Sequence, residues 1–312
     1  MRIFVAGASG AIGQPLIAEL IRQGHTVTAM SRSAAGAQKL VDPRASVAVV
    51  NAFDQLAVEQ ALRRAQAEVV IDQLTALPKD PSQIATAFPG DRKLRLEGGG
   101  NLHRAAQAAG VALYIQQASG FFLKAGRGLA DESTPLATDA SPGVAASARM
   151  YAEIEARLLN SGTMEGIALR YGFFYGQKTW YCEEGAVAEQ VRRQAMPIVG
   201  QGEGVWSWIH IEDAALATLA ALTMQPGIDN VVDDDPSPVS RWLPAFAQWL
   251  GAPPPPQISE QQAREAAGED AVYYGTKLSG ASNEKAKRTF GFRPRRLQWL
   301  DRSATPARPP SA

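Results

Sequence analysis

The sequence predicts an α/β protein with a doubly wound parallel sheet and a smaller C-terminal domain. Two observations support this fold class. Short apolar runs alternate with segments of helical periodicity through the first 170 residues, and such alternation is typical of parallel sheets with right-handed crossovers. The first apolar run also ends in a glycine-rich turn that leads into a helix. We expect one domain over residues 1–170 and a second, mainly over 171–300.

The expected elements follow in chain order. Buried strands are predicted at residues 2–6, 26–30, 46–50, 68–72, 111–115 and 167–170. Helices are predicted at 15–23, 55–66, 92–109 and 145–160, then in shorter pieces near 212–224, 240–250 and 259–267. A late strand near 228–234 should join the first sheet. Residues 301–312 have the composition of a flexible tail.

Composition excludes several classes of function. Lysine plus arginine equals aspartate plus glutamate at 31 each, so the chain lacks the basic field of a nucleic-acid binder. One cysteine and three scattered histidines give no pattern of metal ligands, and we expect no metal. No leader peptide and no run long enough to span a bilayer is recognisable. We therefore expect a cytoplasmic protein without membrane partners.

The glycine-rich turn reads Gly7-Ala-Ser-Gly10-Ala-Ile-Gly13. The first glycine permits a tight turn, the second permits close approach of a pyrophosphate, and the third permits close packing of helix and strand. The following helix N-terminus offers N–H groups and a partial positive charge to phosphate. The turn therefore predicts a Rossmann dinucleotide site, contacted by Gly7, Ser9, Gly10, Ala11, Ile12 and Gly13.

The end of the second strand indicates which dinucleotide binds. NAD-binding proteins usually place a carboxylate there, whereas this chain reads Met30-Ser-Arg-Ser33. Because an arginine can bind the 2′-phosphate of NADP, we expect NADP(H) with Arg32 as its partner. A solvated surface arginine is the alternative.

Four further residues are expected near the cofactor because they follow or end the middle strands. Leu74 and Thr75 follow the fourth strand, and Ala118 lies just beyond the fifth. Asp54 follows the third strand, where it could bind the adenine amine or cap the next helix.

The chain resembles the extended short-chain dehydrogenase/reductase superfamily, in its NAD-dependent epimerase/dehydratase branch. The resemblance covers most of residues 1–300. It is carried by the glycine turn and by four further motifs, which are Ala118-Ser-Gly120, LRYGFFYG at 169–176, WIHIEDAA at 208–215 and KAKRTFGFRP at 285–294. It implies a Rossmann domain with a small C-terminal substrate domain.

The resemblance also implies a catalytic serine, and a tyrosine followed four residues later by a lysine on the same helix face. Ser119 matches the serine. Either Tyr151 is the tyrosine, followed by Glu155, or Tyr151 takes the lysine position and Ser147 the tyrosine position. Both alignments lack the tyrosine–lysine pair. A free tyrosine has a pKa near 10, so ionising its phenol at pH 7 costs about 4 kcal/mol and the residue is a weak base. It can still donate a proton.

The expected reaction site lies at the carboxyl ends of the strands. Its candidate catalytic residues are Ser119, Tyr151, Tyr171 and Tyr175. Its candidate substrate-binding residues are Phe173, Trp180 and Tyr181, which suit an apolar or planar substrate. Core packing of the second domain is the alternative explanation of these aromatic residues.

These observations favour an NADP(H)-dependent reductase of a small aromatic or polycyclic carbonyl compound. Two alternatives stay open because the proton relay is altered. One is a non-redox isomerase, dehydratase, epimerase or cyclase that retains the cofactor, and the other is a non-catalytic NADP(H) sensor. The family resemblance also suggests a homodimer that pairs through the helices at 92–109 and 145–160.

Overall fold

The computed structural model describes residues 1–38 and 42–300. The expected flexible tail at 301–312 lies outside the described residues. No helix in the described part of the chain is long and apolar enough to cross a membrane.

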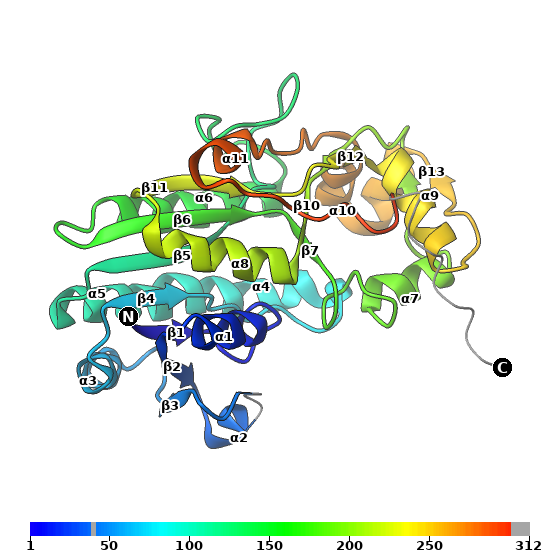
Figure 1. Cartoon of the computed structure of the whole chain (residues 1–312). Coiled ribbons are helices and arrows are strands. Elements are labelled where there is room, and N and C mark those ends of the chain that lie inside the picture. The colour runs from blue at the N-terminus through cyan, green and yellow to red at the C-terminus, as the bar shows by residue number, and fades with distance from the viewer. Residues whose placement is uncertain (39–41, 301–312) are drawn as a thin grey trace.

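A seven-stranded parallel sheet forms the centre of the N-terminal part, in the order β11-β6-β5-β4-β1-β2-β3 (Figure 1). The order reverses at β1, which lies between β2 and β4, and this reversal is the topological switch point of a doubly wound fold. The strands span Arg2–Ala6 (β1), Thr26–Ser31 (β2), Ser46–Val49 (β3), Val69–Asp72 (β4), Leu113–Ser119 (β5), Glu165–Tyr171 (β6) and Gly227–Val231 (β11).

Helices cover both faces of this sheet. They are α1 (Gly13–Arg22), α2 (Ala34–Ala37), α3 (Gln55–Ala65), α4 (Ile84–Lys93), α5 (Gly99–Ala109), α6 (Pro142–Leu159), α8 (Ile211–Ala220) and α11 (Glu284–Phe290). Short 3-10 turns span Pro81–Gln83 (η1) and Ala221–Thr223 (η3), and a π-helical turn spans Leu94–Gly98 (η2).

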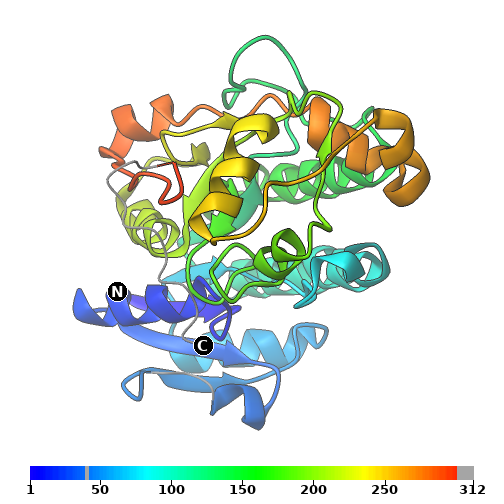
Figure 2. The ribbon, with the colours of Figure 1, turned by 90° about the vertical axis from the view of Figure 1, so that its right-hand side faces the viewer.

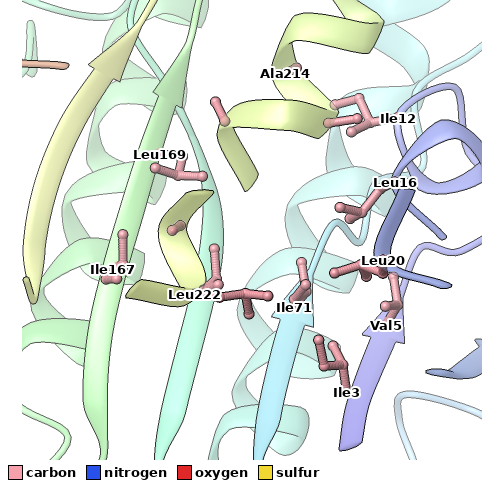
Figure 3. Packing of buried hydrophobic residues seen from close by; sticks show 14 of the residues in the cluster. Ile3, Val5, Ile12, Leu16, Leu20, Ile71, Ile167, Leu169, Ala214 and Leu222 are labelled. Atoms are coloured by element: carbon pink, nitrogen blue, oxygen red, sulfur yellow. The ribbon is translucent and has the colours of Figure 1, made fainter. Parts of the chain in front are cut away.

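The side chains of strand β1 point alternately to the two faces of the sheet, and each face has its own core layer. Ile3 and Val5 pack under α1 and α8, as Figure 3 shows, whereas Phe4 and Ala6 belong to the opposite layer beneath α3, α5 and α6. Successive side chains of a strand point to opposite faces, so a continuous apolar run is what a sheet covered on both sides requires.

The C-terminal part packs over one end of this sheet (Figure 2). Its helices are α7 (Ala186–Arg192), α9 (Val239–Trp249) and α10 (Glu260–Thr276). Its short strands pair as β7 (Phe173–Tyr175) with β10 (Trp208–His210), β9 (Val205–Trp206) with β12 (Ser237–Pro238), and β8 (Ile198–Val199) with β13 (Gln257–Ile258). A core rich in tryptophan holds them together, with Trp206, Trp208, Trp242, Phe246 and Trp299 at its centre.

The main differences from the sequence-based expectation concern three elements. The helix expected near 259–267 runs on to Thr276 as α10. The helix expected over 92–109 is three consecutive segments, α4, the π-helical turn η2 and α5. The strand expected at 111–115 runs on to Ser119. Gln116 and Gln117 obscured its length, because two polar residues interrupt the apolar pattern although both are buried in the sheet.

Candidate functional site

The carboxyl ends of the central strands meet at one edge of the sheet. Ala6 at the end of β1 pairs with Asp72 at the end of β4, and Ser119 at the end of β5 pairs with Tyr171 at the end of β6. Ligands of open α/β sheets bind outside this edge, near the switch point. The loops that follow these strands therefore define the candidate site.

The glycine turn after β1 is packed too tightly for any side chain at two of its glycines. Gly7 has φ of +78°, and a Cβ there would lie 2.3 Å from the carbonyl oxygen of Gln73. A Cβ on Gly13 would lie 2.5 Å from the carbonyl oxygen of Gly7. Gly10 is exposed, and the nearest atom to a Cβ there is that same carbonyl oxygen, 3.2 Å away. The turn is compact inside and open above Gly10.

Helix α1 begins directly after this turn without a side-chain cap or an acidic residue in its first turn. Its N-terminal N–H groups and its dipole therefore favour an anion at this end. Leu16, Ile17 and Leu20 are buried and fix the helix against the sheet. The cradle at Gly10, next to this uncapped helix end, fits the pyrophosphate of a dinucleotide.

Arg32 and Asp54 follow β2 and β3 and are exposed. The Asp54 side chain accepts a hydrogen bond from the backbone N–H of Ala57 at 3.0 Å, so it caps α3. This is one of the two expected roles, and the contact with adenine stays a prediction. No carboxylate ends β2, since Ser31 occupies that position.

Strand β4 ends in a buried carboxylate, Asp72, which was not among the sequence-based candidates. Asp72 accepts hydrogen bonds from Leu74 N at 2.9 Å and from the Tyr114 hydroxyl at 2.8 Å. Burial raises the pKa of Asp72. Its place at the end of an apolar strand was a usable signal, because ligand-facing residues gather there. Leu74 and Thr75 follow it and are half-buried.

A second buried carboxylate fixes the same loop. Asp91 on α4 accepts a hydrogen bond from Ala76 N at 2.6 Å and pairs with Arg95 at 2.7 Å. Both side chains of the pair are 5% exposed. The four-residue spacing suits an ion pair on a helix, but it does not reveal that the pair is buried, because most such pairs lie on the surface.

Ser119 lies at the end of β5, and Tyr151 lies on α6, which packs against β5. Ser119 is 3% exposed and directly follows Ala118. Tyr151 is also buried, and its ring stacks on Phe122, which lies just beyond β5, with ring centres 5.7 Å apart. Burial raises the pKa of Tyr151, and the positive charge of Arg95 offsets only part of this rise. Tyr151 is therefore a phenol at neutral pH.

The residue four positions after Tyr151 is tied up elsewhere. Glu155 forms a two-pronged ion pair with Arg170 of β6, with both N–O distances 2.7 Å and both side chains almost fully buried. Helix α6 therefore offers a carboxylate engaged in the core at the place where the first alignment expects a lysine. Ser147, the candidate of the second alignment, is buried on the same helix.

The other two candidate tyrosines are bound within the core. The Tyr171 hydroxyl contacts the Thr218 hydroxyl at 2.6 Å, and burial raises the pKa of Tyr171 to about 12. The Tyr175 hydroxyl donates to the carbonyl oxygen of Arg296 at 3.3 Å, and its ring meets Trp299 edge-on. Burial also raises the pKa of Tyr175. Both hydroxyls are therefore engaged within the core.

The aromatic candidates separate into two environments. Phe173 is half-buried and lies in a stack between Phe121 and Trp206, with ring centres 4.2 and 4.0 Å away. Tyr181 instead packs in the tryptophan-rich core, edge-on to Trp208. Phe121 was not a sequence-based candidate. It borders a small cavity lined by Gly120, Phe121, Leu123, Val205, Ser207, Leu278, Ser279 and Gly280.

Trp180 and Lys178 connect the C-terminal part to the loops of the cofactor cradle. The indole N–H of Trp180 donates to the carbonyl oxygen of Pro78, beyond β4, at 3.1 Å. The Lys178 ammonium donates to the Gln14 side chain, in the first turn of α1, at 3.0 Å. The segment after β7 therefore reaches both the loop beyond β4 and the first turn of α1.

Comparison with known proteins places this geometry in a family. The model of the NAD dependent epimerase/dehydratase family matches residues 3–232. A 3-diazoavenalumate denitrifying reductase from Streptomyces is 39% identical over 305 residues, covering 96% of this chain and 98% of the relative.

Two solved structures share the fold. The UDP-glucose 4-epimerase of Thermus thermophilus, a complex with NAD, has a TM-score of 0.71 at 23% identity and covers 94% of each chain. The dTDP-glucose 4,6-dehydratase of Streptomyces venezuelae, with NAD bound, has a TM-score of 0.74 at 17% identity, covering 95% of this chain and 93% of its own. With the glycine cradle and the family model in agreement, the chain belongs to the NAD-dependent epimerase/dehydratase family.

Proposed function

We propose that this protein is an NADPH-dependent reductase that replaces a diazo group on a planar aromatic substrate by hydrogen. The observation that carries the proposal is the altered proton relay at Tyr151, where Glu155 stands in place of a lysine and is bound to Arg170. The relative with 39% identity, named as a denitrifying reductase of a diazo compound, supports the same reaction class.

The reaction suits a site without a base. A bound nicotinamide would supply a hydride. When a hydride adds to the carbon of an arenediazonium ion, the carbon–nitrogen bond breaks and N₂ leaves with its bonding electrons, so no proton has to be donated or removed. Reduction of a carbonyl, in contrast, leaves an oxyanion that must gain a proton. Burial raises the pKa of Tyr151, so its phenol can orient a substrate but cannot act as an efficient base.

The chain's own residues would hold the two reactants. The cradle at Gly10 and the N-terminus of α1 would bind the pyrophosphate. Leu74, Thr75 and Ala118 would line the rest of the cofactor. Ser119 and Tyr151 would donate hydrogen bonds at the reacting end. Phe121 and Phe173 would provide aromatic faces for a planar substrate. Trp180 would anchor the segment after β7 to the loop beyond β4 through its hydrogen bond to Pro78.

Preference for NADPH over NADH rests on Arg32. It is exposed directly after β2, where no carboxylate repels a 2′-phosphate. The two solved relatives described above hold NAD, so this residue is the feature expected to set the present chain apart from them. A guanidinium matches a phosphate through paired, charge-assisted hydrogen bonds.

The test compares two acceptors in one protein. With NADPH, we expect turnover of an arenediazonium carboxylate with release of N₂, and the variant Tyr151→Phe should keep that rate to within about tenfold. Reduction of an aromatic ketone of the same size should be slower and should fall by about 100-fold or more in the variant, as expected for loss of a general acid. An equal and large loss on both acceptors, or efficient oxidation of the corresponding alcohol, would contradict the proposal.

A further inference from the structure

A buried positive charge lies next to Tyr151, and it comes from a different helix. Arg95 belongs to the π-helical turn η2, and its guanidinium carbon lies 5.5 Å from the centre of the Tyr151 ring. Arg95 is 5% exposed and Tyr151 is 6% exposed. Because both side chains are buried, the charge acts strongly on the ring and its hydroxyl at this distance.

The π-helical turn places Arg95 in this position. A π-helical turn accommodates one more residue than an α-helical turn, and such turns often lie at functional sites. Here η2 joins α4 to α5, and Arg95 is held by Asp91 one turn earlier. Asp91 in turn accepts a hydrogen bond from the backbone N–H of Ala76. The arginine is therefore fixed both to its own helix and to the loop that follows β4.

The charged and titratable groups around Tyr151 come from four elements. They are Arg95 on η2, Asp91 on α4, Glu155 on α6 and Tyr274 on α10. The negative charge of Glu155 is largely balanced by its ion pair with Arg170. Among these four groups, Arg95 is the cation, and Asp91 partly opposes it.

We propose that Arg95 is a positioning residue for Tyr151, supplying from η2 the positive charge that helix α6 does not provide. This inference rests on the proposed function, in which Tyr151 donates a hydrogen bond to the substrate. The guanidinium holds the ring in place and stabilises the negative charge that grows on the phenol oxygen as it donates. Asp91 sets the orientation of the guanidinium and ties it to the cofactor loop through Ala76.

The test replaces Tyr151 by a fluorinated tyrosine, whose phenol is more acidic, and follows its titration by fluorine NMR in the otherwise intact protein. An opposite charge at this range shifts a pKa by about 1–3 units. Arg95→Met should therefore raise the pKa of the residue-151 phenol by about one unit or more, and Asp91→Asn should lower it. Arg95→Lys, which keeps the charge, should restore most of the wild-type value.

The double variant Glu155→Gln/Arg170→Met is the matched control, because it removes a second buried ion pair that also contacts α6. It should lose stability while shifting the titration less than Arg95→Met does. If Arg95→Met does not fold, two other results still decide the matter. They are the lowered pKa of the residue-151 phenol expected in Asp91→Asn and the nearly wild-type pKa expected in Arg95→Lys. Shifts of the same sign for Arg95→Met and Asp91→Asn, or no shift in Asp91→Asn, would overturn the inference. Because this readout needs no turnover, it stays distinct from failure of the proposed reaction.

Discussion

Substitution of Gly13 by alanine tests the cofactor cradle directly. The new Cβ would lie 2.5 Å from the carbonyl oxygen of Gly7 and 2.6 Å from that of Ala8. Ordinary contact begins at 3.4 Å, so the turn and the start of α1 must separate by about 0.9 Å. Both obstructing atoms belong to the backbone, and no side chain can rotate away to relieve the contact. Overpacking of this kind costs about 1–3 kcal/mol.

The expected consequence is a loss of cofactor affinity. If the binding free energy of NADPH weakens by most of this amount, its Kd rises by about 5- to 150-fold, since 1.4 kcal/mol corresponds to a factor of ten. The assay is titration of NADPH fluorescence at fixed protein concentration, with thermal unfolding measured alongside.

Gly90→Ala provides the matched control. It lies inside α4, and a Cβ there meets nothing within 4 Å. We expect Gly90→Ala to gain about 0.5–1 kcal/mol of stability and to bind NADPH as the wild type does. A Gly13→Ala variant that binds NADPH within about threefold of wild type would refute the account of the cradle.

Three further predictions concern specificity and stability. Arg32→Ala should weaken NADPH binding by about 10- to 100-fold, the loss of a hydrogen bond to a charged group, and should leave NADH binding unchanged; equal effects on both cofactors would contradict the role of Arg32. Arg170→Met should cost about 3–5 kcal/mol in urea unfolding, because Glu155 is left buried and unpaired, and adding Glu155→Gln should recover part of that loss. Burial lowers the pKa of His103 from 6.5 to about 4. The unfolded chain therefore takes up a proton before the folded protein does, and stability should fall as the pH drops from 6.5 toward 4. His103→Asn should flatten this part of the stability profile, and an unchanged slope would exclude the explanation.

Local sequence patterns were sufficient to predict the sheet and its cofactor turn. β1 and β4 each contain a continuous apolar run, at residues 3–6 and 69–71. In the turn between β1 and α1, Gly7 and Gly13 stand where a Cβ would lie within 3 Å of backbone atoms. These features depend on neighbours in sequence and on the general geometry of parallel sheets. The agreement therefore has a physical reason.

The charged groups around Tyr151 could not be predicted in the same way. Arg95 reaches Tyr151 through a π-helical turn 56 positions earlier in the chain, and no local periodicity reports such a contact. In one of the two alignments Glu155 was visible as the residue in place of a lysine, but its pairing with Arg170 depends on how α6 packs against β6. Tyr171 and Tyr175 are the last residues of β6 and β7, a common place for site residues, yet their hydroxyls are bound within the core.

Isotope transfer from NADPH tests the central claim most directly. NADPH carrying deuterium at C4 of the nicotinamide, prepared separately with each of the two stereochemistries, is mixed with the protein and an arenediazonium carboxylate in a single turnover. We predict one N₂ released for each NADPH oxidised, and one deuterium on the product carbon that had carried the diazo group, from one of the two labelled forms. Product formed without oxidation of NADPH, or product without deuterium from either form, would contradict hydride transfer by this protein.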